Sequence, residues 1–258
     1  NPAHLEANIA MVPYLQRKGR REEAIRHLEA ALRVNPNLLD VKFQLGLLYA
    51  QTNRLPEALR VAQEVERAAP KHPGPPTLRG LVLLGQQKPK EALDAFSAAL
   101  KLKGDLFEAH RGQGQAWQAL GQVDRAVESY QRALALNGED IIALNNLAWV
   151  LSESRKKPDE ALPLAQKAAQ RAPQSPEILD TLGWVHYRRG AYAEAEKALA
   201  QAAERAPNSG IIQYHLGMTY SKLGRKADAV SSLRRAAQLD PKLAQAQRIS
   251  ELIKELGG

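Results

Sequence analysis

The chain has 258 residues and a formal net charge of +8. It contains no cysteine, which excludes disulfides, thiolate metal sites and cysteine nucleophiles. No stretch approaches the roughly 20 consecutive apolar residues that a membrane-spanning helix requires, so we expect no membrane span. Aromatic residues make up only 5% of the chain, and strong helix formers such as Ala, Leu, Arg, Gln, Glu and Lys dominate it. This composition predicts an all-α fold.

Three series of residues recur along the chain in one register, which indicates an internal repeat. The first is a series of helix-ending residues spaced at 34 residues, with one extra residue inserted near 155–158: Pro2, Pro36, Pro70, Gly104, Gly138, Pro173, Pro207 and Pro241. The second is a series of alanines: Ala24, Ala58, Ala92, Ala126, Ala161, Ala195 and Ala229. The third is a series of small residues: Ala31, Val65, Ala99, Ala133, Ala168, Ala202 and Ala236.

Each repeat is predicted to form two helices, because a glycine fits the turn between them and a proline or glycine ends the second. In chain order we expect a preceding repeat to end at 1–4, followed by repeats at 5–38, 39–72, 73–106, 107–140, 141–175, 176–209 and 210–243. One more helix, at 243–256, is expected to cap the array, and the final segment 244–258 is assigned to it.

Several positions depart from a regular helix pair. Pro13 lies inside the first helix of repeat one and should kink or shorten it. Pro73, Pro75 and Pro76 should delay the start of the first helix of repeat three. Glycines recur in the middle of first helices, at 46, 80, 114, 183 and 217. Because a glycine inside a helix costs about 1 kcal/mol, we infer that another helix packs against the backbone there.

This pattern resembles the tetratricopeptide repeat, whose signature combines Leu-Gly, an aromatic residue, alanines and a final proline. The seventh repeat carries it as Leu216-Gly217, Tyr220, Gly224, Ala229, Leu233, Ala236 and Pro241. The resemblance covers residues 5–243. It implies a right-handed α-solenoid of seven helix–turn–helix repeats with a C-terminal capping helix.

No pattern in the chain predicts catalysis. The six histidines are scattered, and neither a paired-histidine metal spacing nor a nucleotide-binding or hydrolase motif is present. His186 lies on the core stripe of its helix and is predicted to be a buried, hydrogen-bonded imidazole. We therefore expect a protein that is not an enzyme, with no cofactor and no metal site.

The face of the first helices that points away from the second helices is predicted to line a concave groove. We call it the groove face; it carries positions 2, 5, 6, 9, 12 and 13 of each first helix. In the last three repeats the candidate partner-binding residues on it are Asn145, Asn146, Trp149, Asp180, Thr181, Trp184, Tyr187, Arg188, Tyr214, His215, Met218 and Lys222. Rigid aromatic side chains among polar neighbours are typical of a ligand-lining surface. Simple packing of each Trp against the next helix is the alternative explanation.

Basic residues gather at the ends of the first helices and in the turns after them, from Arg17–Arg21 to Lys222–Lys226. Stacked repeats would align them along one edge as a basic ridge. Cations at helix C-termini favour the helix dipole, which explains the pattern without a ligand. The alternative is an anionic partner such as an acidic polysaccharide. Nucleic acid is disfavoured, because no recognised binding module is present.

The sequence favours a protein–protein interaction scaffold that binds a protein or peptide segment in its groove. Segments 145–149, 158–162, 180–184 and 214–217 resemble the last repeats of bacterial cell-envelope proteins that accompany exopolysaccharide export. That resemblance implies a periplasmic or envelope location, with the cytoplasm as the alternative. Other hypotheses are a carbohydrate- or polyanion-binding module and the adaptor part of a larger enzyme. No cap precedes repeat one, so we expect the native array to continue upstream. The face of 5–17 and 22–34 would then be exposed in this chain and able to self-associate.

Overall fold

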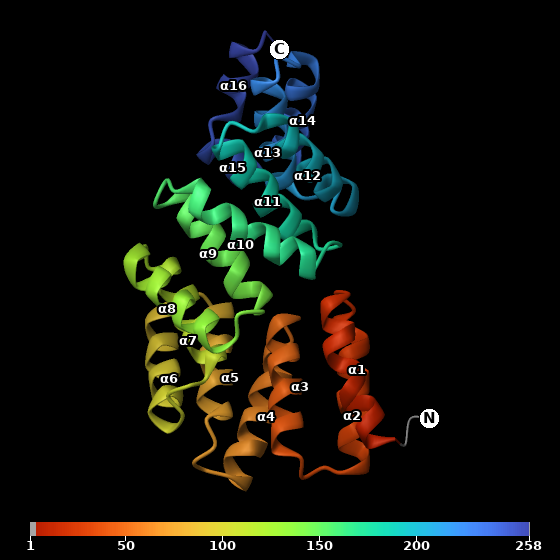
Figure 1. Cartoon of the computed structure of the whole chain (residues 1–258), viewed down its shortest axis with the longest axis vertical. Coiled ribbons are helices and arrows are strands. Elements are labelled where there is room, and N and C mark those ends of the chain that lie inside the picture. The colour runs from red at the N-terminus through yellow and green to blue at the C-terminus, as the bar shows by residue number, and fades with distance from the viewer. Residues whose placement is uncertain (1–3, 258) are drawn as a thin grey trace. The chain divides into compact units, whose positions relative to one another are not determined.

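The structure is a computed structural model that describes residues 4–257 (Figure 1). The predicted end of a preceding repeat falls almost entirely outside the described residues. Within them, the backbone forms sixteen α-helices and no strand, which confirms the all-α prediction. No helix in the described part is long and apolar enough to cross a membrane. The chain forms two compact units, residues 1–150 and 151–258.

The first unit consists of helix pairs that follow one another along the chain (Figure 1). Its helices are α1 (Leu5–Arg17), α2 (Arg21–Val34), α3 (Leu39–Gln51), α4 (Leu55–Ala68), α5 (Gly74–Gly85), α6 (Pro89–Leu102), α7 (Phe107–Ala119), α8 (Val123–Leu136) and most of α9 (Ile141–Glu153). The first helix of a repeat packs against its second helix, and α2, α4 and α6 also pack against the first helix of the next repeat. A continuous apolar core runs between these layers.

The second unit continues the same arrangement. It contains α10 (Pro158–Arg171), α11 (Pro176–Arg188), α12 (Tyr192–Arg205), α13 (Gly210–Lys222), α14 (Lys226–Leu239), α15 (Pro241–Ala246) and α16 (Ile249–Glu255). The pairs α11–α12 and α13–α14 pack closely, and α12 packs against α13. Small residues, among them Ala195, Ala202, Ala229 and Ala236, are fully buried, so the predicted alanine series marks the core.

The turn between the helices of a repeat requires one residue with positive φ. Glycine occupies this position in four repeats, with φ between 70° and 78° at Gly19, Gly121, Gly190 and Gly224. Asn53, Gln87 and Lys156 hold the equivalent positions of repeats two, three and five, with φ of 59°, 60° and 53°. The inserted residue lies in the turn before Lys156, as the register predicted.

The recurring glycines inside first helices are sites of close helix packing. A Cβ added at Gly80 would lie 2.5 Å from the Phe96 ring, and one at Gly114 would lie 2.6 Å from the Tyr130 ring. In the second unit, a Cβ at Gly183 would lie 2.6 Å from Leu199. In each case the neighbour belongs to the second helix of the same repeat. This confirms the inference that another helix packs on the glycine backbone.

Two predictions about prolines have different outcomes. Helix α5 begins at Gly74, one residue later than the register of the other first helices, as the proline cluster predicted. Helix α1, however, keeps the full length of 13 residues despite Pro13 in its interior. Pro13 is exposed, while Val12 and Leu15 are buried against the core. Burial of this apolar face offsets the hydrogen bond that proline cannot make.

The prediction of one continuous capping helix over 243–256 is wrong. The segment forms two short helices, α15 and α16, separated at Arg248, whose φ is 51°. The break lets α16 turn back onto α14 and place Ile249 in a fully buried position. Burying that side chain contributes roughly 1.5–3 kcal/mol, which offsets the cost of the left-handed residue.

Candidate partner-binding surface

The three candidate residues in the first unit lie on α9 and are half-buried. The Asn146 amide donates a 3.4 Å hydrogen bond to the Tyr130 hydroxyl, which donates in turn to Gln118 Oε1 at 2.8 Å. The Oδ1 atom of Asn145 is buried and has no hydrogen-bond partner among the described residues. All three residues therefore keep part of their surface accessible, and Asn146 is also bonded to Tyr130 on α8.

Five of the candidate residues in the second unit are buried: Asp180, Thr181, Trp184, Tyr214 and His215. The indole of Trp184 is 7% exposed and stacks against two rings. Its centroid lies 4.4 Å from the Tyr187 ring and 4.0 Å from the His215 ring, and both pairs are close to parallel. The indole face is therefore occupied by the protein itself, and for Trp184 the packing explanation holds.

Polar contacts hold this aromatic stack from several helices. His215 Nδ1 lies 2.8 Å from Asp180 Oδ1, which joins α13 to α11. The Trp184 indole N–H donates a 2.8 Å hydrogen bond to Glu153 Oε1 at the end of α9. Arg188 Nη1 lies 3.0 Å from the same carboxylate oxygen. Such satisfied buried contacts fix the side chains in one arrangement.

Four candidate residues keep accessible surface: Tyr187, Arg188, Met218 and Lys222. Tyr187 is half-buried, because one of its ring faces packs on Trp184 and its edge meets Tyr192 at 5.5 Å between centroids. This burial raises the pKa of the Tyr187 hydroxyl, which stays protonated at neutral pH. The accessible part of the groove face in this unit thus combines an aromatic ring, a thioether and two cations.

The expectation that all the candidate residues present their side chains to a partner therefore needs correction. Their spacing places them on the groove face, but five of them are buried in the structure. Two further residues contribute, of which Gln247 was missed. Glu153 anchors both Trp184 and Arg188, and Gln247 accepts a 3.1 Å hydrogen bond from the Tyr214 hydroxyl. Position 13 of α9 pointed to Glu153, whereas no sequence signal pointed to Gln247.

The predicted basic ridge is partly neutralised by ion pairs in the structure. Cations at the start of the second helices pair with a carboxylate three residues later: Arg20 with Glu23, Arg54 with Glu57, Lys88 with Glu91, Lys157 with Glu160 and Arg225 with Asp228. Arg189 and Arg225 also reach Asp159 and Glu196 of the preceding repeat. These exposed pairs contribute little stability each, but they reduce the net positive charge of the edge.

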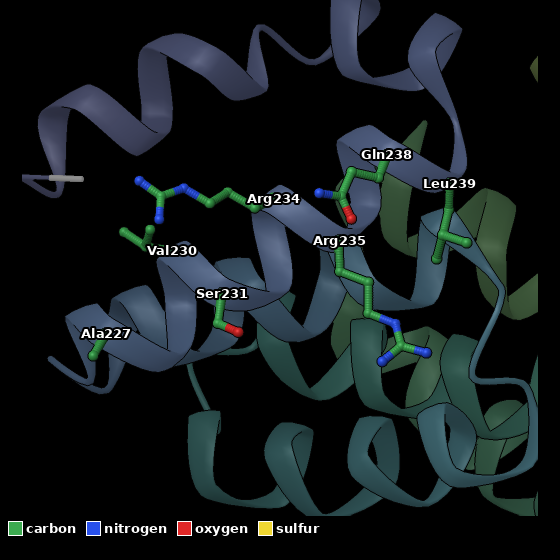
Figure 2. Close-up of a pocket in the computed structure, with 7 residues that line it drawn as sticks. All are labelled: Ala227, Val230, Ser231, Arg234, Arg235, Gln238 and Leu239. Carbon is green, nitrogen blue, oxygen red and sulfur yellow. The ribbon is translucent and has the colours of Figure 1, made fainter.

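A hollow of about 570 Å³ lies on the outer face of α14. It is lined by Ala227, Val230, Ser231, Arg234, Arg235, Gln238 and Leu239 (Figure 2). Figure 2 shows the side chains of Arg234 and Arg235 diverging from the helix in different directions. Arg235 already donates to the Pro207 carbonyl at 2.9 Å. Most of the lining is exposed, so Arg234 and Arg235 do not form an enclosed binding site for an anion.

Within residues 4–257, no group of three or more His, Asp or Glu side chains is arranged to hold a metal ion. The prediction for His186 is only partly right. The side chain is half-buried, but its Nδ1 atom is buried without a hydrogen-bond partner in the described part of the chain. Burial lowers the pKa of His186, which favours the neutral imidazole.

Comparison with known proteins agrees with this arrangement of helices. A model of the tetratricopeptide repeat matches residues 9–73, 77–140 and 118–176, and a second model of the same repeat matches residues 152–214 and 186–253. The TPR repeat-containing protein PA4667 of Pseudomonas aeruginosa is 27% identical over 197 residues, which cover 76% of this chain and 28% of that protein. The chain spans less than a third of the length of the curated relatives it matches.

Two solved structures illustrate the shared fold. The APC/C hetero-tetramer Cut9–Hcn1 superposes with a TM-score of 0.74 and 16% identity, over 98% of this chain and 54% of that one. YrrB, described as a TPR protein with an unusual peptide-binding site, superposes with a TM-score of 0.57 and 21% identity. It covers 74% of this chain and 97% of its own. At these identities the likeness shows the fold alone.

Proposed function

Because this chain belongs to the tetratricopeptide repeat family, we propose that it is a non-catalytic protein–protein interaction scaffold that binds a peptide segment on its groove face. The observation that supports this is the layered construction of the second unit. A buried base of Trp184, His215 and Asp180 holds the half-exposed Tyr187 in a fixed position. The peptide-binding site described for YrrB is consistent with this use of the fold.

The accessible side chains define the kind of segment that fits. Tyr187 and Met218 offer apolar contact, and the aromatic ring is already ordered, so little conformational entropy is lost when a partner binds. Arg188 and Lys222 add positive charge beside them, with Arg188 oriented by Glu153. The segment that suits this surface carries an apolar side chain next to an acidic one.

A peptide display experiment tests the proposal. Random twelve-residue peptides are selected on the immobilised chain, and the best binders are measured by fluorescence anisotropy. We expect apolar–acidic peptides whose affinity falls at least tenfold with Tyr187→Ala or Met218→Ala. The matched control is Gln238→Ala, which removes an exposed side chain from the outer face of α14. Selected peptides that bind both groove variants as well as the unchanged chain would contradict the proposal.

The rival hypothesis of a carbohydrate- or polyanion-binding module receives less support from the same contacts. Both rings stacked on Trp184 belong to the protein, so a sugar ring cannot stack there without displacing one of them. Several of the ridge cations are paired with carboxylates. If heparin or alginate bound to the ridge, its affinity would fall steeply between about 0.05 and 0.5 M salt, because salt screens exposed charges. Groove binding of an apolar peptide would change far less.

We also propose that the scaffold works in the bacterial cell envelope, in the assembly of an exopolysaccharide secretion system. The support is the resemblance of segments in repeats five to seven to envelope proteins of that kind. Cell fractionation followed by detection of the native protein tests this. Recovery with periplasmic or membrane markers supports the proposal, and recovery with cytoplasmic markers alone overturns it. An adaptor role within a larger enzyme would require a catalytic signature elsewhere in the same polypeptide.

A further inference from the structure

Two side chains on the groove face of the second unit share one carboxylate oxygen. Glu153, the last residue of α9, accepts a 2.8 Å hydrogen bond from the Trp184 indole N–H through Oε1. Arg188 Nη1 lies 3.0 Å from the same oxygen. The side chains of Arg188 and Glu153 are 30% and 26% exposed, so this ion pair is partly shielded from water and from salt. Glu153 thus connects the buried aromatic stack with the accessible part of the groove face.

The bond to Trp184 fixes Glu153 in this place. The indole is buried, so water cannot readily replace the acceptor if the carboxylate turns away. A buried donor that loses its acceptor pays the full cost of having left water, which makes such a displacement unfavourable. A partner's carboxylate that drew Arg188 away would also leave the partly buried Glu153 charge without its counter-ion. The negative charge of Glu153 is therefore a permanent part of the surface that a partner meets.

This charge changes what Arg188 can recognise. A carboxylate placed beside the guanidinium would also approach Glu153, and the two negative charges would repel each other. A neutral acceptor, such as a backbone carbonyl or an amide side chain, meets no such repulsion and can accept from the guanidinium N–H groups that Glu153 does not use. The charge also reaches α13, where burial, and after it Glu153, raises the pKa of the Tyr214 hydroxyl. Arg188 therefore favours a neutral acceptor over an acid.

Lys222 provides the contrast within the same unit. It occupies position 13 of α13, as Arg188 occupies position 13 of α11, and its side chain is exposed. Among the described residues, no carboxylate forms an ion pair with Lys222. An acidic side chain of a partner can therefore approach its ammonium group without displacing a counter-ion, and form a charge-assisted hydrogen bond. The two cations at position 13 thus differ in the group that each one accepts.

We propose that Glu153 is a specificity-determining residue of the groove face, which directs the acidic side chain of the partner segment to Lys222 and a neutral acceptor to Arg188. The inference rests on the proposed function, because it assigns places to the polar groups of the same apolar–acidic segment. Repulsion of unsuitable groups is a common source of specificity, since selectivity is a difference between two affinities. Without the Glu153 charge, both cations would attract acids, and the face would select less strictly among acidic segments.

A glutamate scan of a groove peptide tests this. The tightest apolar–acidic peptide from the display selection is resynthesised with Glu at each neutral polar position in turn, and each version is measured by fluorescence anisotropy. For the unchanged chain, we expect at least one version to bind about threefold or more weakly than its parent. In Glu153→Gln, which keeps an acceptor oxygen for the Trp184 indole, the same version should bind at least as tightly as the parent. Glu204→Gln removes a charge at an exposed position of α12 and should leave the scan unchanged.

Two further substitutions separate the cations. Arg188→Gln, added to the Glu153→Gln chain, should remove the attraction of the extra Glu. Lys222→Gln should weaken binding of the parent peptide about threefold or more, but should change little for a peptide whose own acid is replaced by its amide. Near-UV circular dichroism of Glu153→Gln should match that of the unchanged chain. A changed tryptophan spectrum would make Glu153 a packing residue and overturn the assignment.

The failure of this inference differs from the failure of the proposed function. A scan that Glu153→Gln leaves unchanged, or an effect of this variant that persists without Arg188, overturns the inference alone if the parent peptide still depends on Tyr187 and Met218. Loss of that dependence, or a selection that yields no groove peptide, contradicts the proposed function and this inference with it. A penalty for the extra Glu that disappears in Glu153→Gln, with the gain depending on Arg188, supports both.

Discussion

The imidazole of His215 on α13 lies 2.8 Å from the carboxylate of Asp180 on α11, and both side chains are almost fully buried. The pair connects the first helices of two successive repeats beneath the Trp184 ring. The order of the half-exposed Tyr187 therefore depends on a polar contact that no partner can reach directly.

Replacing Asp180 by Ala should destabilise the second unit. The buried His215 nitrogen would lose its partner, and an unsatisfied buried polar atom costs about 1–3 kcal/mol. Asp180→Asn, which keeps an acceptor oxygen, should cost less. Urea unfolding measures the loss, and the fluorescence and near-UV circular dichroism of the tryptophans report whether the stack loosens. Equal stability of Asp180→Ala and the unchanged chain would show that the pair contributes nothing.

Two glycines of α5, Gly80 and Gly85, should respond differently to replacement by alanine. A Cβ at Gly80 would lie 2.5 Å from the ring of Phe96, which is fully buried and cannot move aside. Gly80→Ala should therefore cost about 1–3 kcal/mol through overpacking, although alanine is the better helix former. At Gly85 the nearest atoms are the flexible end of Leu55 at 3.2 Å, so Gly85→Ala serves as the matched control. Its stability should stay within about 0.5 kcal/mol of the unchanged chain, as for most exposed substitutions. Thermal unfolding of the two variants side by side decides the point.

Gln87 holds a left-handed turn position that glycine occupies in four other repeats. A side chain in this conformation costs about 1 kcal/mol or more, so Gln87→Gly should stabilise the chain by a few tenths to about 1 kcal/mol after the greater freedom of glycine in the unfolded state is counted. Asn53→Gly should gain less, because asparagine tolerates this conformation. Chemical denaturation measures both variants, and a loss of stability in Gln87→Gly would show that the turn carries no strain.

Much of the fold follows from the sequence because its determinants are local and repeated. The alanine series, the turn glycines and the prolines each act within one repeat, and seven copies make the register unambiguous. The missed features depend on neighbours. The break at Arg248 arises because burying Ile249 against α14 outweighs the continuity of a helix whose pattern is otherwise regular.

The candidate site shows the same limit. Spacing alone places Trp184 on the groove face of α11 and His215 on that of α13. It cannot tell an open face from one that the next first helix covers. Whether a ring is accessible depends on how close successive first helices lie. That distance is set by residues such as Asp180, which reaches across to His215.

Glu108 on α7 should make the stability of the first unit depend on pH. Burial raises the pKa of its carboxyl, an effect that the nearby Arg111 opposes and Asp140 reinforces. One carboxylate oxygen, Oε2, is buried without a hydrogen-bond partner among the described residues. Because the folded state holds the proton more tightly than the unfolded state, the carboxyl favours folding at low pH. This contribution is lost as the pH rises through the raised pKa.

Glu108→Gln removes the buried charge and should raise the melting temperature at pH 7 to 8. The advantage over the unchanged chain should shrink as the pH falls toward the usual pKa of a glutamate, where the carboxyl is protonated in both states. Glu128→Gln on α8 makes the same charge change at an exposed position and serves as the control. Melting curves of the three proteins between pH 4.5 and 8 give the difference directly, since the other titrating groups cancel. A difference between Glu108→Gln and the unchanged chain that is constant with pH, or equal to that of the control, would show that the Glu108 carboxylate is not penalised by burial.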